Sequence, residues 1–217
     1  MPRVQFQRGL QSLEDGVLEM GFMVDRQIER AMLALTTRDM PLASAVVRDD
    51  GEGNRTRFHL DNTCVSLLAQ QAPMASDLRL IVAVLSIVSE LERIGDHAEG
   101  IARIVLLMQD EPLVKPLIDL PKMAKAARQM LKDALDAFAE RDLDAAYAVG
   151  PADDVVDQLY DRIYRDLVGI MTTDAALIEA ATYLLWTAHN LERIADRATN
   201  VAERVSTLQA AASETPR

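Results

Sequence analysis

The sequence has little of several features that mark particular classes of protein. Of its 217 residues, one is cysteine, three are histidine and 4% are aromatic. Because Cys64 is alone, no disulfide within the chain and no thiolate zinc site is possible. The most apolar segment, residues 80–89, is about half as long as the roughly 20 residues that span a bilayer, and the N-terminus has no signal-peptide pattern. We therefore expect a soluble cytoplasmic protein without direct membrane insertion.

Positive charge is also scarce. The formal net charge is −11, from 23 Lys and Arg against 34 Asp and Glu. A nucleic-acid-binding protein needs a basic surface, so we expect no nucleic-acid partner. The acidic excess suits a protein that binds cations or docks on a basic partner, although it would serve solubility equally well.

Signatures of catalysis are missing too. The chain has no Gly-x-Ser-x-Gly, no P-loop and no Gly-x-Gly-x-x-Gly motif. Ferritin-like di-metal enzymes use Glu-x-x-His on two helices, and no such pair occurs in the acidic motifs described below. His59, His97 and His189 are interpreted as structural or surface residues. We expect the protein not to be an enzyme.

What the chain contains is a pattern of helices. Its abundance of Leu, Ala, Val, Met, Glu and Arg is typical of helices, and apolar residues recur at steps of three and four. Six helices are expected, over approximately 4–37, 39–71, 76–109, 122–140, 142–168 and 172–211.

Local residues predict where these helices start and where they are disturbed. Asp39, Ser76 and Asp142 are expected N-caps because their side chains accept hydrogen bonds from the first turn, and a threonine at 172 or 173 is expected to start the last helix. Gly51 and Gly53 each cost roughly 1 kcal/mol against alanine inside a helix. We therefore expect a kink or fraying there.

The two halves of the chain repeat each other. RDMPLASAVVRDDGEGN, from Arg38, aligns with RDLDAAYAVGPADDVVD, from Arg141, 103 positions later, and residues 91–105 align with 191–205, 100 positions later. Solenoid repeats are shorter, at about 20–50 residues. The sequence therefore predicts an all-α fold of six helices in two pseudo-symmetric three-helix bundles, residues 1–112 and 113–217.

Each repeat carries acidic residues one helical turn apart. Glu92 precedes Asp96, and Glu192 precedes Asp196, both within Glu-Arg-Ile-x-Asp. Like charges at this spacing destabilise an isolated helix by about 0.2–0.5 kcal/mol. The repeat alignment adds a second oxygen-bearing pair on the preceding helix of each half: Asp50 with Asn54, and Asp153 with Asp157.

Neighbouring antiparallel helices would bring these pairs together as a cation site in each half. Oxygen ligands suit Mg²⁺, Ca²⁺, Mn²⁺ and iron, and zinc is less typical without His or Cys. The alternative is that Glu92 and Glu192 pair with Arg93, Arg193 or a neighbouring helix, while the aspartates are simply solvated.

Four segments together resemble the PhoU family. LERIGDHAEGIARI, NLERIADRATNVAE, QQAPMASDLRLI and DDVVDQLYDRIYRDL match it in both halves, over nearly the whole chain. The resemblance implies a cytoplasmic, non-enzymatic negative regulator of phosphate uptake and of the phosphate-starvation response. Such a protein would link the ATPase of the Pst phosphate ABC transporter to the phosphate-sensing histidine kinase, as a homodimer.

The resemblance also implies a divalent or multinuclear metal, iron or zinc in the family with Mg, Mn or Ca possible, held by the four pairs named above. The first half departs from the pattern, with neutral Asn54 opposite Asp157 and two glycines beside it. A carboxamide is a weaker ligand than a carboxylate, so the second half is predicted to bind metal more tightly or to hold more ions. Two alternatives stay open: an accessory regulator of a different transporter, and a carboxylate-bridged metal hydrolase.

Overall fold

The computed structural model describes residues 3–70, 73–109 and 113–210, and over these ranges the chain is helical and has no strand. The elements are α1 (Arg3–Thr37), α2 (Met40–Gln70), α3 (Ala75–Met108), α4 (Asp119–Glu140), α5 (Leu143–Thr173), the short 3₁₀ helix η1 (Ala175–Leu177) and α6 (Ile178–Ala210). The predicted all-α, six-helix fold is confirmed.

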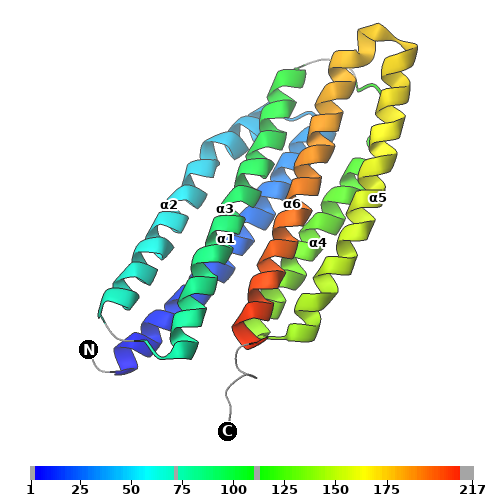
Figure 1. Cartoon of the computed structure of the whole chain (residues 1–217). Coiled ribbons are helices and arrows are strands. Elements are labelled where there is room, and N and C mark those ends of the chain that lie inside the picture. Colours follow the sequence, from blue (N-terminus) through cyan, green and yellow to red (C-terminus); the bar gives the residue numbers. More distant parts are fainter. Residues whose placement is uncertain (1–2, 71–72, 110–112, 211–217) are drawn as a thin grey trace.

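The helices form two similar groups of three that pack side by side. α1, α2 and α3 contact one another, as do α4, α5 and α6, and the groups meet where α3 packs on α6 and α1 on α4. In Figure 1, α2 and α5 lie at the two outer edges, with α1 and α4 behind α3 and α6. The α3–α6 contact and the α1–α4 contact therefore lie on opposite faces of the molecule.

The core is built from the apolar stripe of each helix, and it follows the repeat. In α1 and α4, residues 103 positions apart occupy the same buried places, because the same helix face meets the same neighbours. The buried pairs include Val17 with Leu120, Met20 with Met123, Val24 with Ala127 and Ile28 with Leu131.

Two of the three expected N-caps are confirmed. The Asp39 carboxylate accepts a hydrogen bond from the backbone N–H of Leu42 at 2.8 Å, at the start of α2. The Asp142 carboxylate accepts one from Ala145 N–H at 3.0 Å, at the start of α5. In each case the side chain satisfies an N–H that the first turn leaves without a helical partner.

Two helix starts differ from the prediction. Ser76 lies inside α3, where Asp77 accepts a hydrogen bond from Met74 N–H at 3.3 Å. α6 does not begin at Thr172 or Thr173, which end α5; instead Asp174 accepts from Ala176 N–H at 2.9 Å and opens η1. The acidic side chain caps in preference to the neighbouring hydroxyl in both places.

The sequence predicts a kink or fraying of the second helix, and the fraying is wrong. α2 continues without a break through Gly51 and Gly53, although Figure 1 shows it bending in its N-terminal part. The buried side chains Val46 and Leu60 lie on either side of the glycines and hold the helix against α1 and α3. Tertiary packing thus outweighs the local cost of glycine.

The division between the halves, placed after residue 112, lies outside the described residues, which resume at 113. α4 begins at Asp119, so Pro121 falls in its first turn, where no backbone N–H is needed. In the described part of the chain, no helix has a stretch both long and apolar enough to cross a lipid bilayer.

Candidate functional site

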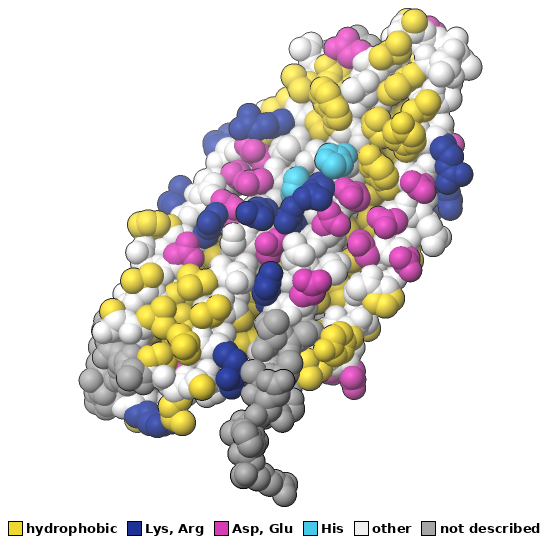
Figure 2. Space-filling view, viewed as in Figure 1, with side chains coloured by type: hydrophobic (Ala, Val, Ile, Leu, Met, Phe, Trp, Pro, Cys, Tyr) yellow, Lys and Arg dark blue, Asp and Glu magenta, His cyan; other side chains and the backbone are white. Residues whose placement is uncertain are grey.

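The predicted site residues lie on two pairs of neighbouring helices, α2 with α3 and α5 with α6. Figure 2 shows that charged side chains gather over the middle of this face, whereas hydrophobic side chains lie towards both ends. Each half therefore contributes its own set of oxygen-bearing side chains. The first-half set is Asp50, Asn54, Glu92 and Asp96, and the second-half set is Asp153, Asp157, Glu192 and Asp196.

The carboxylates of the second-half set are close enough to raise one another's proton affinity. Partial burial, and then the negative charges of Asp157, Asp196 and Glu192, raises the pKa of Asp153 to about 6. The pKa values of Glu192 and Asp157 are raised too, in both cases first by burial and then by the charge of Asp196. The two acidic pairs of this half do face each other, as predicted.

Two buried oxygen atoms of the second-half set have no hydrogen-bond partner among the described residues. They are Oδ1 of Asp153 and Oε2 of Glu192. Buried polar atoms without a partner are uncommon in folded proteins, because each one loses its hydration without compensation. These atoms therefore fit a bound cation better than they fit the bare protein.

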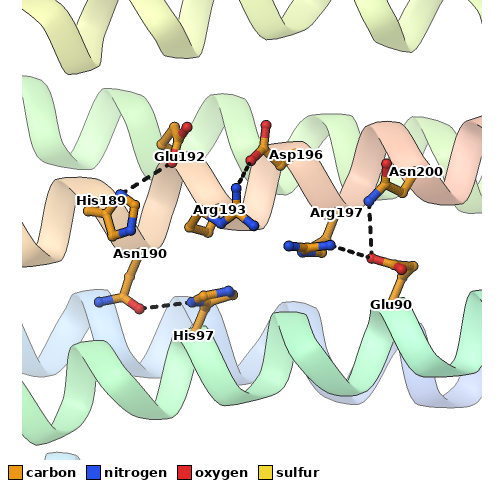
Figure 3. Close-up of polar contacts among 9 residues, drawn as sticks. All are labelled: Glu90, His97, His189, Asn190, Glu192, Arg193, Asp196, Arg197 and Asn200. Carbon is orange, nitrogen blue, oxygen red and sulfur yellow. Dashed lines mark hydrogen bonds and ion pairs between the residues drawn. The ribbon is translucent and has the colours of Figure 1, made fainter.

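Two acidic side chains of α6 already have a basic side chain of the same helix nearby (Figure 3). Arg193 Nη1 donates to Asp196 Oδ2 at 2.6 Å, and His189 Nδ1 lies 3.4 Å from Glu192 Oε2. The ion-pair alternative expected Arg193 to pair with Glu192 and Asp196 to be solvated, so the Arg193–Asp196 pair differs from that expectation. His189, interpreted as a surface residue, is largely exposed but does reach the second-half set.

One carboxylate of the first-half set is paired with a cation from the facing helix. Arg57 of α2 forms an ion pair with Glu92 at 2.6 Å and lies 3.7 Å from Asp61. Glu92 therefore pairs with a neighbouring helix, as the ion-pair interpretation also allowed. Partial burial and the charges of Glu92 and Asp50 still raise the pKa of Asp96 to about 6, with Arg57 acting in the opposite direction.

Asp50 of the first-half set has amide donors on both of its oxygens. Gln27 of α1 donates to Oδ1 at 3.1 Å, and Asn54 donates to Oδ2 at 3.4 Å. Asn54 thus serves as a hydrogen-bond donor in this arrangement. Its amide gives Asp50 a partner where a carboxylate would add repulsion.

Arg57 and Gln27 were missed from sequence, although the repeat contained the signal. At the spacing of 103 residues, Arg57 corresponds to Tyr160 and Gln27 corresponds to Met130. Burial and the charge of Glu192 raise the pKa of Tyr160, so this phenol does face the second-half set. Extending the repeat alignment three residues past Asn54 would have shown that the first half has the cation Arg57 where the second half has the neutral Tyr160.

Comparison with known proteins also divides the chain into two similar halves. A family model described as "PhoU domain" matches residues 17–105 and again residues 120–205. The chain belongs to the PhoU family. Among curated relatives, the Escherichia coli protein named phosphate-specific transport system accessory protein PhoU is 38% identical over 202 residues, covering 92% of this chain and 83% of the relative. The homolog of that name from Clostridium acetobutylicum is 38% identical over 204 residues, covering 94% and 93%.

Solved PhoU structures have the same fold. The PhoU crystal structure from Pseudomonas aeruginosa superposes with a TM-score of 0.91 at 35% identity, covering 95% of this chain and 99% of the other. The phosphate transport system regulatory protein PhoU from Streptococcus pneumoniae gives a TM-score of 0.88 at 32% identity, covering 95% and 97%. The six-helix arrangement of this PhoU-family chain is thus shared along nearly its whole length.

A pseudo-symmetric polar seam joins the two PhoU repeats where α3 meets α6. Glu90 accepts from Arg197 at 3.3 Å and from Asn200 at 3.2 Å, while Asn190, which corresponds to Glu90, contacts His97 Nδ1 at 3.0 Å (Figure 3). Burial, and then the charges of Arg193 and Arg197, lowers the pKa of His97 despite this contact. His97 therefore has the structural role expected of it.

Neither set is arranged as a finished metal centre. Within the described residues, no three His, Cys, Asp or Glu side chains are grouped so that they could hold a metal ion as they stand. The ion pairs of Arg57 with Glu92 and of Arg193 with Asp196 engage carboxylate oxygens that a metal would need as ligands. A metal would therefore have to replace these arginines at the carboxylates.

Proposed function

We propose that this chain is a negative regulator of phosphate uptake and of the phosphate-starvation response, working in the cytoplasm without catalytic turnover. The observation that carries the proposal is similarity over more than nine-tenths of the chain to proteins named as accessory proteins of phosphate-specific transport. An accessory protein acts through contacts, and this chain offers a charged face along α3 and α6 on which partners can bind (Figure 2).

We further propose that it works as an adaptor between the ATPase subunit of the Pst transporter and the phosphate-sensing histidine kinase, as a homodimer. The acidic surfaces around the two sets are complementary to basic surfaces on such partners. The polar seam between α3 and α6 would couple the two sets, because a shift of either helix changes the contacts of Glu90 and Asn190 in the other half.

Metal binding is part of this proposal. The second-half set would hold a divalent or multinuclear metal through Asp153, Asp157, Glu192 and Asp196, and the first-half set would use the corresponding residues. The metal would supply positive charge to Oδ1 of Asp153 and Oε2 of Glu192, which accept no hydrogen bond from the described residues, although His189 lies 3.4 Å from the latter. The iron or zinc of the family and Mg, Mn or Ca all accept carboxylate oxygen.

Gene deletion tests the regulatory proposal. Phosphate-response genes should then be expressed constitutively at high phosphate, and expression of the wild-type chain should restore repression. Capture of the Pst ATPase and the sensor kinase by the tagged chain from its own cells would support the adaptor role. Expression that stays phosphate-responsive after deletion would contradict the regulatory role, and capture of a different transporter instead would favour the alternative of another accessory role.

One observation favours a metal hydrolase as the second candidate: a carboxyl group with a pKa of about 6, such as Asp153, is suited to acid–base chemistry near neutral pH. Phosphatase assays on zinc- and manganese-loaded protein with p-nitrophenyl phosphate separate the two functions. The regulatory proposal predicts no turnover above the metal-only control. Turnover that disappears in Glu192→Gln would support the hydrolase.

A further inference from the structure

A groove on the face opposite the acidic sets is not explained by the proposed function. It lies between α1 and α4, which are behind α3 and α6 in Figure 1, and its volume is about 600 Å³. Apolar side chains form its floor and one rim: Leu18 and Phe22 from α1, and Leu131 and Leu135 from α4. Phe22 is 63% exposed, which is unusual for an aromatic side chain that serves only the core.

The close approach of α1 and α4 makes this floor continuous. Gly21 lets Leu135 lie directly against α1, since a Cβ there would overlap the leucine side chain. Leu135 lies at Gly21, and Arg128 contacts Asp25, so the two helices run antiparallel. The α4 residues that line the groove extend from Lys125 to Ala139, a length of about 21 Å at 1.5 Å per residue.

The groove also holds positive charge without a counter-ion of its own. All four lysines of the chain lie between residues 115 and 132. Lys115 pairs with Asp166 at 2.6 Å, and Lys122 with Asp119 at 3.1 Å. The remaining two, Lys125 and Lys132, both line the groove, and neither has an ion-pair or hydrogen-bond partner among the described residues.

The other charged residues of the groove are placed differently. Arg128, between the two lysines, donates to both oxygens of Asp25 at 2.7 and 2.8 Å and to Glu29 at 3.1 Å, so its charge is already balanced. Asp136 lies one turn beyond Lys132 and gives that end of the groove a negative charge. The two cations of the groove without an ion-pair partner among the described residues are therefore Lys125 and Lys132, seven residues apart along one edge.

We propose that this groove docks an amphipathic helix of a partner protein, with apolar side chains towards α1 and acidic side chains towards Lys125 and Lys132. The α4 wall of the groove, about 21 Å long, matches roughly four turns of helix, and helix-in-groove recognition uses apolar anchors at steps of three and four. Acids seven residues apart would lie on one edge of that helix, two turns apart, at the spacing of the lysines. Elsewhere the chain is strongly acidic, so the lysine edge selects for such a partner.

The probe is a capped 15-residue helical peptide with leucines at steps of three and four and two glutamates seven residues apart on one edge. Its matched control has lysines in place of the glutamates. Binding is measured by fluorescence anisotropy on the full chain, and backbone amide shifts locate the peptide. Four proteins are compared: wild type, Phe22→Ala, Lys125→Gln with Lys132→Gln, and the control Lys115→Gln with Lys122→Gln, which removes the same charge outside the groove.

We expect the acidic peptide to bind wild type and the control pair equally, and to bind the Phe22 and Lys125/Lys132 variants about tenfold more weakly. Shift changes should map to α1 and α4. The proposal is overturned if the peptide does not bind, if the control pair weakens binding as much, or if the changes map elsewhere. If the Lys125/Lys132 variant alone no longer dimerises in sedimentation, the groove binds a second copy of the chain instead. If that variant alone no longer binds phosphatidylglycerol vesicles, the groove binds a lipid surface instead.

Discussion

The two halves carry carboxylates at three matched positions, with Asn54 in place of the fourth in the first half, and in the described residues only the first half pairs one of them with a cation from the neighbouring helix. In the first half, Arg57 of α2 bonds to Glu92 at 2.6 Å. In the second half, Tyr160 occupies the position of Arg57, and the exposed His189 lies 3.4 Å from Glu192. Arg193, on the same helix as Glu192, pairs with Asp196. A single replacement between repeats therefore changes the charge balance of a whole set.

The first half also provides a hydrogen-bond donor to its aspartate where the second half does not. Gln27 donates to Asp50 Oδ1 at 3.1 Å, whereas the corresponding Met130 offers no donor, and Oδ1 of Asp153 is buried without a hydrogen-bond partner among the described residues. The first half thus resembles a site closed by its own side chains, whereas the second keeps carboxylate oxygens that a cation could bind, with Arg193 to be displaced from Asp196. Sequence duplication preserved the ligand-type residues while the residues around them diverged.

The largest expected effect comes from removing carboxylates in matched pairs. Asp153→Asn with Glu192→Gln should weaken zinc or manganese binding by about 100-fold, at the upper end of what changes around metal ligands produce. Asp50→Asn with Glu92→Gln should weaken it much less, because Glu92 is already engaged by Arg57. Calorimetric titration and elemental analysis measure both. Equal losses in the two double variants would contradict the inequality of the sites.

Exchanging the arginine between halves gives the next largest effect. Tyr160→Arg should place a guanidinium beside Glu192 and weaken metal binding at the second-half set about tenfold, the equivalent of one charge-assisted hydrogen bond. Arg57→Tyr should strengthen binding at the first-half set. The control is Tyr147→Arg, which adds the same charge at an exposed position of α5. An unchanged titration curve for Tyr160→Arg would show that local charge does not set the affinity.

The pH dependence of stability reports the repulsion among the carboxylates of the second-half set without metal. The unfolded pKa of an aspartate is about 3.9, and that of Asp153 in the folded chain is about 6. The folded state therefore holds this proton more tightly than the unfolded state does. Its stabilising contribution is complete below about pH 4 and is lost as the pH rises through about 6.

In EDTA at pH 7, Asp153→Asn should consequently stabilise the protein by about 1 kcal/mol after allowance for solvent screening, or about 2–4 °C in Tm. The variant should also flatten the pH profile between about 4 and 6. Thermal unfolding measures both, with Asp133→Asn as a charge-matched control on α4. A lower Tm for Asp153→Asn at pH 7 would mean that the carboxylate is stabilising as it stands.

The smallest expected effect comes from making the first half resemble the second at one hydrogen bond. Gln27→Met leaves Asp50 Oδ1 without its amide donor and should cost about 0.5–1 kcal/mol in the metal-free protein. Chemical denaturation at neutral pH is sensitive enough to detect this. No loss of stability would show that water replaces the amide, and that the hydrogen bond does not distinguish the halves.

The fold could be predicted well from sequence because its signals are local and repeated. Apolar residues at helical steps placed the helices, and Asp39 and Asp142 marked two starts through their capping chemistry. The α3–α6 and α1–α4 contacts could not be predicted, since periodicity tells which helix face is apolar but not which helix covers it. Packing also overrode the local signal at Gly51 and Gly53.

The candidate site was predicted in part for a similar reason. Acids at matched positions of a repeat identify the two sets, and the structure brings each set together. The residues that engage the first-half set, the cation Arg57 from α2 and the hydrogen-bond donor Gln27 from α1, belong to no motif, and only the packed helices show what they contact. The lysine-edged groove has no signal in any one helix, because it is made by two helices about a hundred residues apart.

Anomalous diffraction from crystals grown with limiting zinc or iron distinguishes the two sets, because it assigns metal occupancy to each of them separately. We expect the stronger peak between α5 and α6, at Asp153, Asp157, Glu192 and Asp196, with little or none at the first-half set. A stronger or equal peak at Asp50, Glu92 and Asp96 would contradict this expectation.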